Sequence, residues 1–317
     1  MATVVGGLFD TSRSNGLITA VDADIINSVL TRFSIAETSV QQVTSNTVLS
    51  GDTSHFVAVD PNNTTGVSVV GGDGGDMVVG AGGNDSFIGG AGNDTQLGGA
   101  GSDSIVGGAG DDVLLGGDGN DVVTGSTPDG GGVAAASGDK QLEGNRGDDT
   151  LVGGLGNDTL RGGKGADSIE ATAGDNSVFG GNDNDTILGG TGSDTLQGNA
   201  GEDSITAGAG NTELRGGKDS DILVGNTGND TLYSGQGSDT LTGGAGDDVF
   251  GFKDGDGDNI ITDFTAGNDR ISLEGYAFED VTVSDNDAGD AVVTLPDGTT
   301  ITLEGVNAAD VTSDFFL

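Results

Sequence analysis

Residues 71–124 read GGDGGDMVV, GAGGNDSFI, GGAGNDTQL, GGAGSDSIV, GGAGDDVLL and GGDGNDVVT, six nonapeptides that follow one another without a gap. Twelve more nonapeptides fill residues 144–251 in the same way. Their shared pattern is G-G-x-G-x-D-x-U-x, in which U is a large apolar residue. Eighteen copies in register indicate a repetitive fold rather than a conventional globular core.

The chemistry of each position predicts a turn followed by a short strand. Glycine at positions 1, 2 and 4 permits positive φ angles and close backbone approach, so the first six residues can form a tight turn. Positions 7 to 9 form a strand in which position 8 points inward and positions 7 and 9 point outward. Two nonapeptides complete one flattened coil, and successive coils stack at about 4.8 Å. We therefore predict an all-β parallel roll with 18 residues per coil.

Aspartate at position 6 supplies hard oxygen ligands at the edge of this roll, and the turn carbonyls supply more, which suits Ca²⁺. Repeats n and n+2 lie on the same edge, so one ion can bind between their two aspartates. Without the ion the stacked carboxylates repel one another, and we infer that folding and metal binding are coupled. The predicted metal ligands are Asp76, Asp85, Asp94, Asp103, Asp112, Asp121, Asp149, Asp158, Asp167, Asp185, Asp194, Asp203, Asp221, Asp230, Asp239 and Asp248.

The nonapeptide resembles the calcium-binding repeat of RTX (repeats-in-toxin) proteins over more than half of the chain. This resemblance implies a right-handed parallel β-roll with Ca²⁺ as its only cofactor. The alternative is a disordered glycine-rich tract. It is disfavoured because low-complexity sequence has no reason to keep aspartate at position 6 and an aliphatic residue at position 8.

The array is interrupted once, at residues 125–134 (GSTPDGGGVA), which we interpret as a bulging loop. Beyond it Lys140, Asn176 and Thr212 replace the position-6 aspartate at intervals of 36 residues. Because two coils contain 36 residues, all three fall on the same edge. Pairing the remaining aspartates within each block leaves ten complete pairs, so we predict at least ten Ca²⁺ ions.

Two explanations of this regular loss of carboxylates remain open. One is duplication of a four-nonapeptide unit after a single loss. The other is a patterned, partly basic face for a partner. Six of the ten basic residues lie in this block: Lys140, Arg146, Arg161, Lys164, Arg215 and Lys218.

Residues 1–70 are interpreted as an N-terminal cap that covers the first coil. We expect a short amphipathic helix over residues 22–33 and a strand over residues 55–59. A decayed repeat over residues 62–70 would place Val69 at position 8. Position 9 of the first block is also largely apolar. Something is therefore expected to cover it, either the N-terminal segment or a neighbouring subunit.

Residues 252–317 are interpreted as a β-rich C-terminal cap, with strands inside residues 259–273 and 291–303. This segment resembles the one that follows RTX arrays in secreted metalloproteases (serralysin type) and alginate epimerases. The last four residues, DFFL, resemble the uncleaved C-terminal signal for type I secretion. They could equally form a final strand that caps the core.

Composition excludes several functions. A formal net charge of −41 disfavours nucleic acid and anionic membranes as partners. No apolar run is long enough to span a bilayer, and the first residues do not resemble a secretory signal peptide. About 70 residues precede the array, too few for a catalytic domain. The chain has one histidine, no cysteine and no G-x-S-x-G motif, so we do not expect an enzyme.

The resemblance and the composition together favour a secreted structural protein. We expect export by type I secretion, folding on Ca²⁺ outside the cell, and self-assembly into a surface layer (S-layer) or filament. The partners would be further copies of the chain. The alternative is a monomeric calcium-dependent adhesin or glycan-binding module that contacts cell-surface polysaccharide.

Overall fold

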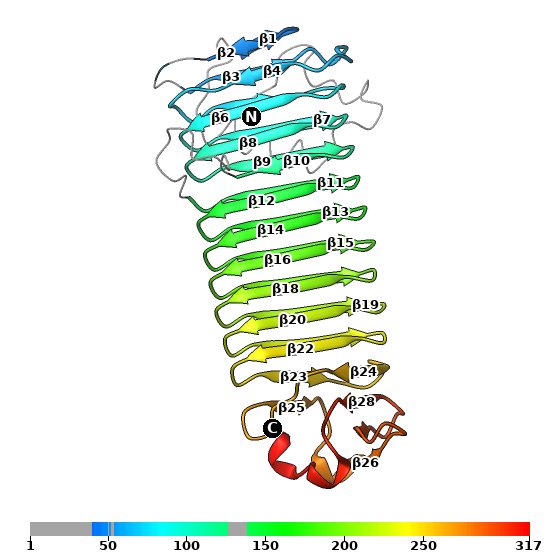
Figure 1. The fold of residues 1–317 in the computed structure, drawn as a ribbon. Helices are drawn as coiled ribbons and strands as arrows, with labels where there is room; N and C mark the ends of the chain where they lie inside the picture. Colours follow the sequence, from blue (N-terminus) through cyan, green and yellow to red (C-terminus); the bar gives the residue numbers. More distant parts are fainter. Residues whose placement is uncertain (1–39, 50, 52–53, 126–137) are drawn as a thin grey trace.

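The computed structural model describes residues 40–49, 51, 54–125 and 138–317. Within these ranges the chain winds into a parallel β-solenoid whose coils stack along one axis (Figure 1). Leu160 lies opposite Val178, and Ile187 opposite Ile205, so the regular coils of the array contain 18 residues each. The predicted all-β parallel roll is confirmed.

Sheet A forms one face of the roll, and all of its strands are parallel. In spatial order it contains β1 (Val40–Val43), β3 (Phe56–Val59), β5 (Met77–Val79), β7 (Thr95–Ala100), β9 (Val113–Asp118), β11 (Gln141–Arg146), β13 (Thr159–Lys164), β15 (Ser177–Asn182), β17 (Thr195–Ala200), β19 (Glu213–Lys218), β21 (Thr231–Gln236), β23 (Val249–Phe252) and β25 (Arg270–Leu273).

Sheet B forms the opposite face and ends in an antiparallel hairpin pair. In spatial order it contains β2 (Thr47–Val48), β4 (Ser68–Val70), β6 (Ser86–Ala91), β8 (Ser104–Ala109), β10 (Val122–Thr124), β12 (Thr150–Leu155), β14 (Ser168–Ala173), β16 (Thr186–Thr191), β18 (Ser204–Ala209), β20 (Ile222–Thr227), β22 (Thr240–Ala245), β24 (Asp258–Ile261), β28 (Thr300–Leu303), β27 (Ala291–Thr294) and β26 (Thr282–Asp285).

The described helices are all short 3₁₀ turns: η2 (Phe278–Asp280), η3 (Ala308–Asp310) and η4 (Ser313–Phe315). In the described part of the chain, no helix has the length and apolar character that crossing a bilayer requires.

Position 8 of each repeat fills the space between the two sheets, as predicted. Leu142, Leu160 and Ile187 are fully buried, like nearly every residue in this column. Burying one such side chain contributes about 1.5–3 kcal/mol. Gln96 is the exception, because this polar residue takes position 8 in β7 and is also fully buried.

The interruption adds ten residues to one coil without shifting the register. Asp121 bonds to Asp149 across 28 residues, whereas the same bond elsewhere in the array spans 18. Leu114 accordingly lies opposite Leu142, both at position 8. The array therefore resumes as the sequence predicted, and most of the loop lies outside the described residues.

The parallel sheets begin before residue 71, where we placed the boundary between the N-terminal cap and the array. β1 and β2 begin it, and β3 and β4 confirm the strand over 55–59 and the inward-facing Val69. The helix expected over residues 22–33 lies outside the described residues.

Outward positions near the N-terminal end differ between the two sheets. On sheet A, Met77, Val79 and Leu115 are buried, so these positions are covered as expected. The N-terminal segment proposed as the cover lies largely outside the described residues. On sheet B, Ile88 keeps 39% of its surface exposed.

The C-terminal segment closes the core with aromatic rings. Phe264 lies between Phe250 and Phe315, at ring-centroid distances of 6.2 and 4.9 Å. The DFFL tail packs on this end as η4 and a single bridge from Phe316 to Ile271 rather than as a strand.

Candidate calcium-binding edges

The turns of the roll lie along two edges. Edge A is the line of turns that lead into sheet A, with Asp76, Asp94, Asp112, Lys140, Asp158, Asn176, Asp194, Thr212, Asp230 and Asp248 at position 6. Edge B is the line of turns that lead into sheet B, with Asp85, Asp103, Asp121, Asp149, Asp167, Asp185, Asp203, Asp221 and Asp239. All sixteen predicted ligands are buried, each with at most 3% of its surface exposed.

One oxygen of each carboxylate is held by the neighbouring coil. Asp103 Oδ1 accepts the backbone N–H of Asp85 at 2.8 Å, and Asp203 Oδ1 accepts that of Asp185 at 2.8 Å. The same bond recurs along both edges. It links successive coils and fixes the direction in which the second oxygen points.

The second oxygen is buried and has no hydrogen-bond partner in fourteen of the sixteen aspartates. The exceptions lie in the first turns, where Oδ2 of Asp76 and Asp85 accepts the N–H of Gly72 at 3.0 Å and of Ala81 at 3.4 Å. An unpartnered buried acceptor costs about 1–3 kcal/mol. Two rows of such oxygens therefore need a cation.

Glycine at position 1 makes room for this oxygen. A Cβ on Gly153 would lie 2.6 Å from Oδ2 of Asp158, closer than such atoms approach. Where position 6 is not aspartate, in the repeats of Asn176 and Thr212, position 1 is Ala171 or Ala207. The glycine thus accompanies the carboxylate in all but one of the aspartate repeats, the exception being Ser234, which takes position 1 in the repeat of Asp239.

Burial raises the pKa of many of these carboxyl groups above the ordinary value. The pKa of Asp94 rises to about 8, first because of desolvation and then because Asp112 and Asp76 are close. Asp221 behaves alike, with a pKa of about 8 from desolvation and from its neighbours Asp203 and Asp239. Without metal, Asp94 and Asp221 therefore hold protons near neutral pH that a divalent cation would displace.

The donor set fits Ca²⁺, which prefers carboxylate and carbonyl oxygens. Each pair brings two carboxylates together, and the described residues contain no group of three or more acidic, histidine or cysteine ligands. Backbone carbonyls of the turns must therefore complete each coordination shell. The role of each aspartate as a ligand stays a prediction.

The structure brings together the ten predicted aspartate pairs and adds two. Across the interruption, the N–H of Asp121 donates to Oδ1 of Asp149 at 2.7 Å. Beyond the array, the N–H of Asp248 donates to Oδ1 of Asp269 at 3.1 Å. Sequence reasoning missed Asp269 although GND at residues 267–269 repeats the end of the turn motif. On edge B, Asn259 closes the row in the same way.

Position 5 carries a second ladder that sequence reasoning also missed. Asn93 Oδ1 accepts the N–H of Asp111 at 3.1 Å, and Asp111 Oδ1 accepts that of Asp139 at 3.0 Å. This ladder runs in the opposite direction along the chain from the position-6 ladder. The frequent Asn and Asp at position 5 were its signal.

The three replaced aspartates lie on edge A, as predicted. Lys140 is fully buried, however, so it cannot belong to a basic outer face. Arg161 and Arg215 are exposed and stack over Phe179 at 5.0 Å and Tyr233 at 4.3 Å.

A family model for the RTX calcium-binding nonapeptide repeat matches residues 69–96, 97–127, 143–178, 162–196, 179–214 and 215–250. These segments cover more than half of the chain. The chain belongs to the RTX calcium-binding repeat family. The predicted calcium-binding repeat protein is thereby confirmed.

Two solved structures are similar to this RTX chain. The AlgE6R3 subunit of the Azotobacter vinelandii mannuronan C5-epimerase has 23% identity and a TM-score of 0.31, over 46% of this chain and 81% of the subunit. The extracellular lipase LipA of Serratia marcescens has 18% identity and a TM-score of 0.32, over 71% of this chain and 44% of the lipase. No curated protein matches the chain.

Proposed function

We propose that this RTX protein is an exported structural protein that folds on Ca²⁺ and self-assembles into a surface layer or filament. RTX repeats are typical of extracellular proteins exported by type I secretion. Millimolar Ca²⁺ outside the cell would fill the edges, at the affinity usual for extracellular modules. The observation that carries the proposal is the outer face of sheet B.

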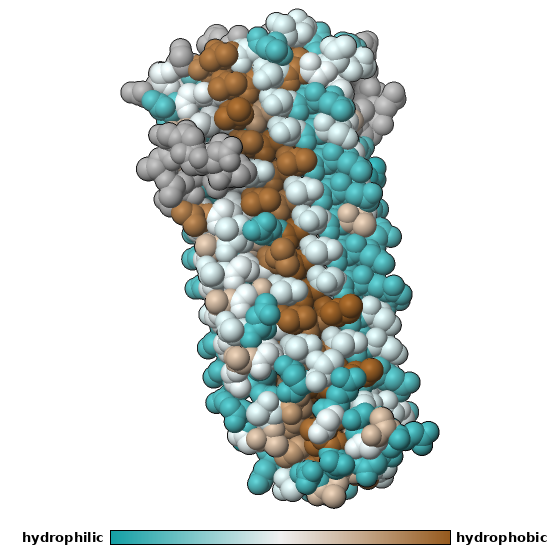
Figure 2. Space-filling view, viewed as in Figure 1, coloured by the Kyte–Doolittle hydropathy of each residue, from teal (hydrophilic) through white to brown (hydrophobic). Residues whose placement is uncertain are grey.

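This outer face is almost free of charge. The ten sheet B strands from β4 to β22 each present positions 7 and 9 outward. Glu170 is the only ionisable residue at these outward positions. The others are Ser, Thr, Val, Ile and Leu. Val48, Ile88, Val122, Leu188 and Ile222 keep 39–77% of their surface exposed, and Figure 2 shows the apolar residues as a stripe along the long axis.

A second copy of the chain is the partner that fits this face. Each copy carries a formal net charge of −41, so two copies repel one another wherever their acidic turns meet. The outer face of sheet B allows contact without that repulsion. Ten strands at about 4.8 Å spacing give a contact line of roughly 45 Å. We assign the protein no enzymatic activity, nucleic-acid binding or membrane insertion.

Electron microscopy of the purified chain, chelated and then supplied with millimolar Ca²⁺, tests the assembly. Ordered sheets or fibres that appear only with Ca²⁺ are expected. Separate rods at high protein concentration would refute self-assembly.

Aspartates introduced on the outer face of sheet B test whether this face is the contact between copies. Leu188→Asp and Val224→Asp should raise the protein concentration needed for assembly at least tenfold, because like charges across an interface cost several kcal/mol. Gln197→Asp adds the same charge at position 9 of sheet A and should leave assembly unchanged. Assembly that tolerates both sheet B variants would move the contact elsewhere.

A hollow on the opposite face favours the alternative function, a monomeric adhesin that binds cell-surface polysaccharide. The hollow has a volume of about 680 Å³ and is lined by Gln197, Arg215 and Tyr233 among others. Aromatic and polar side chains together suit sugar rings. Binding to a glycan array that Tyr233→Ala abolishes would support this role, and no binding at millimolar Ca²⁺ would count against it.

A further inference from the structure

Lys140 occupies a position that the repeat reserves for a metal-binding aspartate. It takes position 6 of the first repeat after the interruption, and its side chain has no exposed surface. Lysine is almost never fully buried without a partner, because its desolvated charge is costly. The partners of its ammonium group therefore indicate what the site requires.

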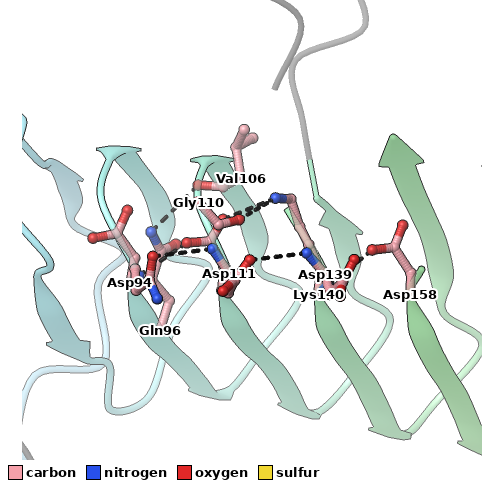
Figure 3. Close-up of polar contacts among 10 residues, drawn as sticks. Asp94, Gln96, Val106, Gly110, Asp111, Asp139, Lys140 and Asp158 are labelled. Atoms are coloured by element: carbon pink, nitrogen blue, oxygen red, sulfur yellow. Dashed lines mark hydrogen bonds and ion pairs between the residues drawn. The ribbon is translucent and has the colours of Figure 1, made fainter. Parts of the chain in front are cut away.

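The ammonium group lies between two neighbouring turns of edge A (Figure 3). Lys140 Nζ donates to the carbonyl oxygen of Gly110 at 2.6 Å and lies 3.4 Å from Oδ2 of Asp112. These are the position-4 carbonyl and the position-6 carboxylate of the preceding coil. Oδ2 of Asp112 accepts no hydrogen bond, like that of Asp94, but the ammonium gives it an ion-pair partner.

The backbone around Lys140 keeps the geometry of the other turns. The N–H of Lys140 donates to Oδ1 of Asp158 at 2.8 Å, as an aspartate at this position would. Asp112 Oδ1 likewise accepts the N–H of Asp94 at 2.9 Å. Only the side chain differs, so the positive charge reaches a site built like its neighbours.

Asn176 shows a neutral version of the same replacement. Its Nδ2 donates to the position-4 carbonyl of Gly174 and to Oδ1 of Asp194, both at 3.0 Å. Gly174 belongs to the turn of Asn176 itself and Asp194 to the following coil, whereas Lys140 reaches back to the carbonyl and Oδ2 of the preceding coil. Lys140 therefore differs from Asn176 in bringing a positive charge to the Oδ2 side of a position-6 carboxylate.

We propose that the Lys140 ammonium is a built-in replacement for Ca²⁺ on edge A. The coil that joins the two arrays then takes no metal ion between the turns of Asp112 and Lys140. It holds together at that point without calcium. Edge B of the same coil keeps its carboxylate pair, Asp121 and Asp149. This inference does not depend on self-assembly.

Native mass spectrometry of the calcium-loaded chain tests the replacement. Lys140→Asp should bind one or two more Ca²⁺ ions than the unchanged chain, because it restores pairs with Asp112 and Asp158. The matched control is Lys164→Asp, which makes the same charge change at the exposed last residue of β13 rather than at position 6 and should leave the count unchanged. An equal count for Lys140→Asp and the unchanged chain would overturn the proposal.

A measurement on the unchanged protein covers the case in which Lys140→Asp does not fold. An amine-reactive label applied to the calcium-loaded chain should modify Lys164 and the other exposed lysines while sparing Lys140. Labelling of Lys140 at the rate of Lys164 would contradict its place inside the edge.

Discussion

Two substitutions at Asp203 separate the two tasks of a position-6 carboxylate. Asp203→Asn keeps Oδ1, which accepts the N–H of Asp185, and removes the charge at Oδ2. The chain already shows the outcome at Asn176, where Oδ1 still accepts the N–H of Asp158 and the amide nitrogen faces the carbonyl of Gly174. Asp203→Ala removes both functions.

The structure sets the size of each effect. Asp203 pairs with Asp185 and Asp221, so either substitution weakens two predicted calcium sites. An ion at 100 times its Kd stabilises the fold by about 2.7 kcal/mol, so weakening two costs up to about 5 kcal/mol in both variants. Alanine also leaves the buried N–H of Asp185 without an acceptor, which adds about 1–3 kcal/mol.

Chemical denaturation at saturating Ca²⁺ measures these free energies of unfolding, and native mass spectrometry counts the bound ions. Both variants should bind fewer ions. Asp203→Ala should be the less stable of the two by about 1–3 kcal/mol, the cost of leaving the N–H of Asp185 without an acceptor. The matched control Glu202→Gln neutralises an exposed carboxylate in the same turn and should change neither. Equal stability of the two variants would refute the Oδ1 ladder. An unchanged ion count in Asp203→Asn would refute Oδ2 as a ligand.

Three further predictions concern the metal-free edges, the turn glycine and the core. In excess chelator the folded roll binds more protons than the unfolded chain, since burial raises the pKa of Asp94 and Asp221 to about 8. Stability should therefore fall as the pH rises from 5 to 8, and circular dichroism would show it; a pH-independent spectrum would contradict the raised values. Gly162→Ala should weaken calcium binding at Asp167, which pairs with Asp149 and Asp185, by crowding Oδ2, so an unchanged calcium titration would count against that contact. Gln96→Leu should stabilise the calcium-loaded roll by about 1–3 kcal/mol in denaturant, because its Oε1 is buried without a partner, whereas a loss of stability would indicate a needed polar contact.

The repeat pattern predicted the register because each nonapeptide carries its own turn and strand. Aspartate at position 6 and an apolar residue at position 8 sufficed to place the edges and the core. The ten added residues between Leu114 and Leu142 left this periodicity intact. A pattern that recurs so often tolerates a local insertion.

The features that could not be predicted from the sequence depend on how the coils stack. Oδ1 accepts an N–H of the neighbouring coil while Oδ2 stays without a partner, because neighbouring coils are offset from each other. No single repeat contains this offset. Lys140 looked like a surface charge because its reach to Gly110 crosses the interruption. Asp269 went unnoticed because the residues before its turn had lost the glycine pattern.

Far-UV circular dichroism of the whole chain during a Ca²⁺ titration from excess chelator, at pH 8, tests the coupling of folding to metal binding most directly. The unpartnered carboxylate oxygens predict a largely unfolded chain in chelator and a cooperative gain of β-structure at millimolar Ca²⁺. A β-rich spectrum that persists in excess chelator would contradict the assignment of these oxygens as the calcium ligands on which the fold depends.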